Sequence, residues 1–161
     1  MKKALSVLAL VFCICGSSAA ADMKGKVGLG IRNDDLSMRY FISNSFAVDA
    51  AVSYQYIDRD GSGISDGYAL AAGGLYNKEI YSDIMLQTGA LLLYSPGRNA
   101  GKPDKQYGIN PFFGAEILIK DHFGLDFKII PFGFIHYDNG SGTSQKTITS
   151  MMGSFGAHIY F

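Results

Sequence analysis

The chain lacks several features on which soluble domains rely. It has no tryptophan, only 4 prolines and only 2 cysteines among 161 residues, and 17% of its residues are charged, against about a quarter in an average soluble domain. Both cysteines, Cys13 and Cys15, lie within the first 21 residues, so a mature chain that begins at residue 22 has no disulfide and no thiol chemistry. The 14 Lys plus Arg balance 14 Asp plus Glu, which excludes a nucleic-acid-binding protein that depends on a basic surface.

The N-terminal segment has the three-part pattern of an export signal. Two lysines give it a positive start, an apolar run follows from Ala4 to Cys15, and small residues end it at Ala21, as signal peptidase requires. The apolar run is too short for a transmembrane helix, which needs about 20 residues. We therefore predict a signal peptide over residues 1–21, cleaved after Ala21, and one mature domain over residues 22–161.

In the mature sequence, apolar residues alternate with small or polar ones. Over residues 46–57 the apolar side chains, such as Phe46 and Val52, lie at even positions, and the small or polar ones, such as Asp49 and Ser53, at odd positions. Side chains of a β-strand point alternately to the two faces of a sheet, so one face suits lipid and the other a small polar interior. Eight segments are predicted as strands: 26–32, 36–42, 46–57, 68–76, 83–94, 107–120, 123–137 and 150–161.

The connections agree with the even strand number of bacterial single-chain barrels. The expected periplasmic connections are short, and three expected extracellular connections, at 58–67, 95–106 and 138–146, are longer and rich in turn-forming residues. The first connection, Asn33-Asp34-Asp35, is a tight hairpin where a loop is expected. Pro131 cannot donate a hydrogen bond to a neighbouring strand, so we expect a bulge there.

These patterns predict an all-β fold, an eight-stranded antiparallel up-and-down transmembrane β-barrel preceded by a cleaved signal peptide. The alternative is a soluble barrel of the lipocalin type, whose interior is apolar and whose exterior is polar. The charged residues favour the membrane barrel, because they share strand positions with Gly, Ala and Ser rather than with Val, Ile and Phe. The predicted charge network of the lumen contains Arg39, Asp49, Gln87, Glu116, Asp126 and Lys128.

An eight-stranded barrel has an interior that side chains roughly fill, so a wide porin-like channel is not expected. The network then has two interpretations. It is either a plug of ion pairs and hydrogen bonds, or a narrow path for ions or protons.

Two local sequences resemble those of the small outer-membrane β-barrel proteins of Gram-negative bacteria, the group that includes the barrel of outer membrane protein A and the opacity-type surface proteins. One is the hairpin sequence Met38–Asp49. The other is the C-terminus, which is similar to the assembly signal of such barrels through Phe155, Ala157, Ile159, Tyr160 and Phe161. The resemblance implies an outer-membrane location, and insertion by the assembly machinery with periplasmic chaperones as transient partners. It does not imply one activity, and we expect a monomer.

One segment bears on catalysis. His136-Tyr137-Asp138 resembles the His-x-Ser segment of outer-membrane lipid A deacylases, in which the serine is the nucleophile and the histidine its general base. Asp138 stands at the serine position and has no hydroxyl to accept an acyl group, so no catalytic residue is expected. No cofactor or metal site is expected either, because the three histidines are placed apart, and a calcium loop starting at Asp58 would have Ala69 in place of its final glutamate.

The only locally basic stretch is 95–106, which contains Arg98, Lys102 and Lys105 against a single Asp104. Lipopolysaccharide phosphates lie at that height of an outer membrane, so we predict that these three residues contact lipid. The sequence thus predicts an integral outer-membrane protein with a structural or surface-interaction role, not an enzyme. The alternatives are a lipid A-modifying enzyme and a narrow ion channel.

Overall fold

The computed structural model describes residues 22–59, 63–81, 83–99, 102–120, 122–138, 144–149 and 151–161, and the predicted signal peptide lies outside them. None of the described residues belongs to a helix long and apolar enough to cross a membrane. The strands are β1 (Val27–Arg32), β2 (Asp35–Phe41), β3 (Phe46–Arg59), β4 (Gly63–Tyr81), β5 (Ile84–Asn99), β6 (Lys102–Ile119), β7 (Phe123–Ile130), β8 (Gly133–Asp138), β9 (Ser144–Thr149) and β10 (Met152–Tyr160).

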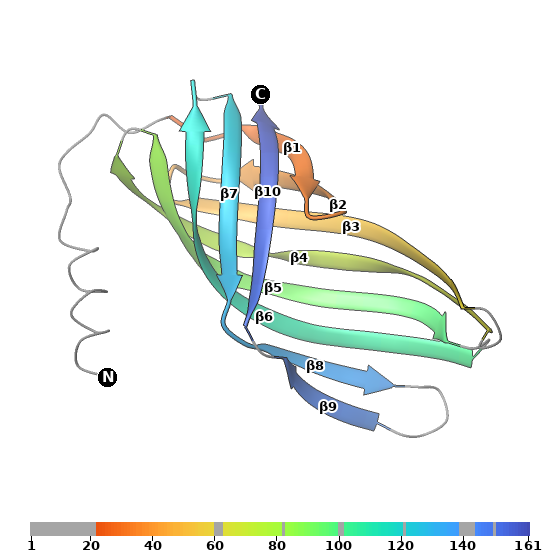
Figure 1. Ribbon diagram of the computed structural model, residues 1–161. Helices are drawn as coiled ribbons and strands as arrows, with labels where there is room; N and C mark the ends of the chain where they lie inside the picture. Colours follow the sequence, from red (N-terminus) through yellow and green to blue (C-terminus); the bar gives the residue numbers. More distant parts are fainter. Residues whose placement is uncertain are drawn as a thin grey trace, which may run out of the picture.

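The strands close into an antiparallel barrel (Figure 1). The ring runs from β1 through β2, β3, β4, β5, β6 and β7 to β10, which pairs again with β1. β8 continues β7 within the predicted strand 123–137, which is interrupted. β9 lies before the predicted strand 150–161 and leads into β10, so β9 and β10 together take one place in the ring. The prediction of an all-β, eight-stranded antiparallel barrel is therefore confirmed.

The interruption lies at Pro131, as predicted. β7 ends one residue before it, and β8 begins at Gly133. Both pair with β6, through Phe113 with Ile129 and through Ile109 with Phe134. Four steps along β6 thus correspond to five steps along β7 and β8, which is the extra residue of a bulge.

Two of the three predicted long outer connections, 58–67 and 95–106, are mostly strand, and this part of the prediction is wrong. Strand pairing continues to Arg59 with Gly63 and to Asn99 with Lys102, and in the third connection it reaches Asp138 with Ser144. Pairing continues because it satisfies the backbone N–H and C=O groups whatever the side chains are. Turn-forming composition alone therefore placed the strand ends too early.

The exterior is apolar and the interior is charged. Leu29, Ile117 and Phe127 are each about half exposed (51%, 49% and 51%), whereas Arg39 and Glu116 are fully buried at 0%. This distribution is the reverse of that in a soluble barrel with an apolar binding cavity.

Apolar side chains fill the end of the barrel that carries residues 22–26 and the C-terminal residue, which we call the proximal end. Met23 is fully buried there in a cluster that includes Phe41, Leu118 and Tyr160. The backbone N–H groups of Met23 and its neighbour donate to Asn44 Oδ1 at 3.1 and 2.9 Å. The segment before β1 is thereby folded into the barrel opening.

The opposite end, which carries the β3–β4, β5–β6 and β8–β9 hairpins, is called the distal end, and its wall is incomplete. The β1–β2 hairpin turns early, with Asn33 at a φ of 51°. β2 pairs with β3 only as far as Val52, but β3 pairs with β4 as far as Arg59. Within the described ranges, β9 pairs only with β8. The distal wall is thus an open sheet with β3 and β9 at its edges.

Candidate functional site: the charged lumen

A cluster of charged and polar side chains fills the lumen of the proximal half. Alternation along each strand turns these residues inward, opposite the outward apolar positions. Glycines on neighbouring strands give the long side chains room, since a Cβ at Gly124 would lie 2.2 Å from Glu116 Oε1 and one at Gly156 would lie 2.6 Å from Asp126 Oδ1. The cluster contains Arg32, Ser37, Arg39, Asp49, Gln87, Glu116, Asp126, Lys128, His158 and Tyr160.

Arg39 on β2 is the centre of the cluster. Its Nη1 donates to Glu116 Oε2 at 2.6 Å and to the Tyr160 hydroxyl at 3.0 Å. Its Nη2 lies 3.3 Å from Asp49 Oδ2 and 3.6 Å from Asp126 Oδ1. One guanidinium therefore contacts all three buried carboxylates, which its planar fork of donors allows.

Asp49 receives two further cations. Lys128 Nζ lies 2.9 Å from Asp49 Oδ2 and 3.4 Å from Asp126 Oδ2, and it also lies 5.0 Å from the centre of the Phe112 ring. Arg32 Nη2 forms an ion pair with the same Asp49 oxygen. The two carboxylates on β3 and β7 are thus joined through Lys128 as well as through Arg39.

Gln87, Tyr160 and His158 also contact the carboxylates of the cluster. Gln87 Nε2 donates to Glu116 Oε2 at 2.8 Å, and the Tyr160 hydroxyl donates to Glu116 Oε1. His158 Nδ1 lies 3.1 Å from Asp126 Oδ1, and its Nε2 lies 3.0 Å from Ser37 Oγ. The hydrogen-bonded groups extend across the lumen from β2 to β6 and β10.

The charges in this cluster balance. Asp49, Glu116 and Asp126 face Arg32, Arg39 and Lys128, and each of these side chains is at most 5% exposed. A buried ion without a counterion costs several kcal/mol, so equal numbers of the two signs are what a stable lumen requires.

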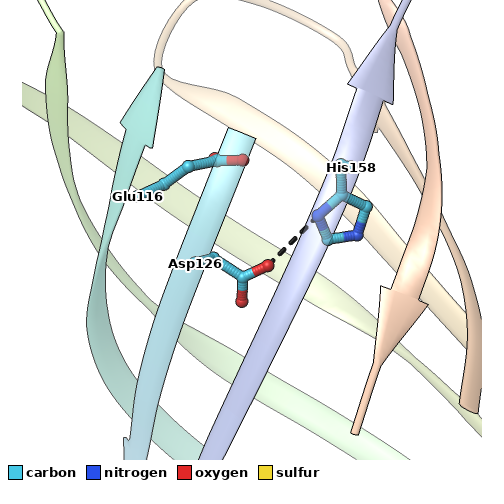
Figure 2. Close-up of side chains that lie close together, drawn as sticks. All are labelled: Glu116, Asp126 and His158. Atoms are coloured by element: carbon cyan, nitrogen blue, oxygen red, sulfur yellow. Dashed lines mark ion pairs between the residues drawn. The ribbon is translucent and has the colours of Figure 1, made fainter. Parts of the chain in front are cut away.

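One subset of the cluster has the spacing of a metal site. Potential ligand atoms of Glu116, Asp126 and His158 all lie within 4.8 Å of one another, and Figure 2 shows Asp126 pointing toward His158 with Glu116 beside them. However, Arg39 lies within 4.0 Å of both carboxylates, and Lys128 lies near Asp126. A divalent cation would be repelled by these charges at short range, so the arrangement favours ion pairing over metal binding.

The structure brings together all six residues predicted for the lumen. Arg32, a further candidate for the lumen in the sequence, also belongs to the network. The prediction did not include Tyr160, His158 or Ser37 in the network. The alternation along the last strand could have predicted Tyr160 and His158 as lumen residues, because each is next to Ile159, which points outward. Of the C-terminal signal residues, Phe155, Ile159 and Phe161 are exposed, Ala157 is partly buried, and Tyr160 is buried in the lumen.

The predicted lipid contacts lie at the distal end. Lys105 is exposed on β6, opposite Asp138 on β8. Arg98 and Lys102 belong to β5 and β6, but their side chains lie outside the described part of the structure, as do most of those in the segment compared with a calcium loop. The His136 ring lies 4.6 Å from the Tyr107 ring, centre to centre, at an angle of 36°.

Neither a protein-family model nor a curated protein sequence matches this chain. The evidence for function is therefore the distribution of apolar and charged side chains and the contacts between them.

Proposed function

We propose that the protein is an integral outer-membrane β-barrel protein with a structural role, whose lumen is sealed by the charge network. The observation that carries this proposal is the reversal of polarity, with apolar side chains outside and balanced charges inside. A protein in water gains by burying apolar surface. An exterior of this kind is favourable only against lipid or another apolar partner.

Aromatic side chains on the exterior support a membrane position. Near the distal end, Tyr54 pairs with Tyr68, and Tyr94 pairs with Tyr107; all four are between 43% and 67% exposed. Near the proximal end of β3, the Phe46 ring lies 5.2 Å from the Tyr76 ring. Along β3 the two aromatic levels enclose residues 46–54, in agreement with the roughly 9–11 residues of a membrane-spanning strand. Aromatic residues concentrate at both membrane interfaces.

The packing of the lumen favours a sealed barrel over an ion channel. The charge network lies distal to a second layer in which Met23, Phe41 and Leu118 are at most 2% exposed. An ion would have to break balanced ion pairs and then pass an apolar layer. The structural role is therefore the better interpretation of the two that the sequence left open.

The C-terminal residues support a contact with the outer-membrane assembly machinery. Ile159 and Phe161 are exposed on the outside of the barrel at 52% and 73%. Exposed apolar residues at the end of the last strand offer such a partner an apolar contact surface, and periplasmic chaperones would protect the apolar exterior before insertion. Catalysis is not part of the proposal, because Asp138 has no hydroxyl that could act as a nucleophile.

The first experiment is envelope fractionation of cells that produce the protein, followed by gel electrophoresis with and without boiling. We expect the protein in the outer-membrane fraction, and a change in mobility on boiling because the closed barrel unfolds only when heated. A soluble periplasmic product without that change would disprove the proposal.

Planar-bilayer recording then tests the sealed lumen. We expect no steady conductance from the wild-type protein. A steady current that changes in Glu116→Ala or Lys128→Ala would instead support the ion-channel alternative. Lipid analysis of cells with and without the protein tests the enzyme alternative, which predicts an altered acyl pattern.

A further inference from the structure

A groove with a volume of about 630 Å³ crosses the exterior of the distal wall over β5, β6, β8 and β9. This volume lies within the range of about 300–1,000 Å³ that is usual for small-molecule sites. Its floor includes the backbone of Gly108, Ile135 and Thr147, which are paired in one row, Gly108 with Ile135 and Ile135 with Thr147. Rows of exterior side chains stand on both sides of this floor.

The row toward the proximal side is apolar. Ile109 pairs with Phe134, and Phe134 pairs with Ile148; these residues are 41%, 49% and 71% exposed. Leu92 on β5 pairs with Ile109 and extends the row at 62% exposure. This side of the groove offers only hydrocarbon contacts, which suit an acyl chain.

The row toward the distal side is aromatic and basic. Tyr107 pairs with His136, and His136 pairs with Lys146. Lys146 is exposed, and Lys105, two pairs further toward the distal end, is also exposed and lies opposite Asp138. Two lysines beside one aspartate leave this side positively charged, which complements a phosphate.

The bulge at Pro131 explains why a groove forms here. Bulges increase the local twist of a sheet. Directly after this one, the Phe132 and Phe134 rings lie 5.4 Å apart at 73°, and the Tyr107 and His136 rings form a second pair across the floor. Phe134, which packs against Phe132, thus lines one side of the groove, and the Tyr107–His136 pair lines the other.

We propose that this groove binds one acyl chain of a phosphate-bearing membrane lipid, with the phosphate at Lys146. The inference rests on the proposed membrane function and adds a defined lipid site to it. Polarity increases from Ile148 in the proximal row to His136 and Lys146 in the distal row, as it does in a lipid from the acyl chain to the headgroup. The positive charge selects anionic lipids over zwitterionic ones. Of the three residues predicted to contact lipid, Lys105 lies beside this site, whereas Arg98 and Lys102 belong to the distal ends of β5 and β6.

The absence of tryptophan from the chain allows a direct test. Leu92→Trp places a single indole in the groove, and Ile117→Trp places one on the exterior of the same sheet, outside the groove, where Ile117 is 49% exposed. Each variant is inserted into phosphatidylcholine vesicles that contain a minor component of either brominated-chain phosphatidylglycerol or brominated-chain phosphatidylcholine. Bromine quenches an indole that lies beside the chain.

We expect stronger quenching by the anionic lipid at position 92 and equal quenching by the two lipids at position 117. Adding Lys146→Gln should reduce the preference at position 92 about fivefold, because one lysine near an anionic membrane surface contributes that ratio. Lys24→Gln, which removes an exposed charge at the proximal end, should not change it.

The possible contrary results are distinguishable. A preference that is equal at the two positions, or one that survives Lys146→Gln, would overturn the lipid site and leave the membrane barrel intact. If brominated phosphatidylcholine quenches neither indole in a protein that still shows the heat-dependent change in gel mobility, the exterior does not face lipid. The proposed function and the lipid site would then fail together.

Discussion

The proximal and distal halves of the barrel are built differently. In the proximal half all eight strands pair on both sides, and the lumen contains three carboxylates, three cations and an apolar layer around Met23. In the distal half the β1–β2 hairpin has ended, the sheet is open at β3 and β9, and the groove lies on the exterior. Figure 1 shows β8 and β9 extending beyond the ends of β7 and β10.

This difference suggests a division of roles. Closure and charge compensation fix the proximal half, because an unpaired charge there would be costly. Among the described residues, the distal half has strand edges without a partner strand, and it has exposed side chains. It can change without loss of the barrel, as the loops on other rigid scaffolds do. The predictions below therefore compare a proximal substitution with a distal one of the same type.

The largest effect is expected for Arg39→Met. This change removes the one cation that contacts all three carboxylates and leaves buried negative charge in excess. We expect a loss of about 3–5 kcal/mol in the free energy of unfolding, measured by urea unfolding in lipid vesicles. Lys105→Met, an exposed distal cation, should change it by less than about 0.5 kcal/mol.

A double substitution sharpens this prediction. Glu116→Gln combined with Arg39→Met restores equal numbers of buried charges, so it should be more stable than Arg39→Met alone, as expected for coupled residues. If Arg39→Met and the double variant both unfold at the wild-type urea concentration, the network does not stabilise the proximal half.

The next effect is expected for Met23→Ala. Met23 is fully buried in the proximal opening, and truncating a buried methionine costs at least about 2 kcal/mol. The matched change is Met151→Ala in the distal half, where Met151 is 74% exposed. Urea unfolding should separate the two variants clearly. Equal stabilities would mean that the segment before β1 does not contribute to closing the barrel.

A smaller effect is expected for Tyr160→Phe. The Tyr160 hydroxyl contacts Arg39 and Glu116, and its loss leaves buried groups with one partner fewer, at a cost of about 1–2 kcal/mol. Tyr107→Phe is the distal counterpart and removes an exposed hydroxyl, so its unfolding curve should match that of the wild type. A larger loss for Tyr107→Phe would contradict the comparison.

Sequence reasoning predicted the strands and the lumen face because both depend on local alternation. Asp49 and Glu116 share parity with small residues, and this pattern is visible without knowledge of the register. The partner of each charge is not visible, since the contact between Arg39 and Glu116 depends on how separate strands are aligned. Met23 has no periodic pattern around it, so its burial could not be predicted.

The distal half was predicted less well for a related reason. Composition indicated loops at 58–67 and 95–106, whereas pairing between backbones extends the strands through most of both segments. The groove depends on the alignment that places Tyr107, His136 and Lys146 in one row. The sequence around His136 resembles a catalytic segment, whereas the position of these residues in the sheet supports the proposed lipid site.

The smallest effect is expected for Pro131→Ala, which tests what causes the bulge between the two halves. The same break separates β9 from β10, and the two interrupted strands keep their register across it, with Ile130 opposite Met152 and Gly133 opposite Thr149. The strand made of β7 and β8 and the strand made of β9 and β10 therefore shift together relative to β6. Since the second of these strands contains no proline, Pro131 is not the sole cause of the bulge. Pro131→Ala should keep the bulge and change the free energy of unfolding by less than about 1 kcal/mol. Amide hydrogen exchange at Phe134 and Ile135 should stay within severalfold of the wild-type rate, whereas strong new protection continuous from Ile129 to Phe134 would show that the proline alone separates the proximal half from the distal half.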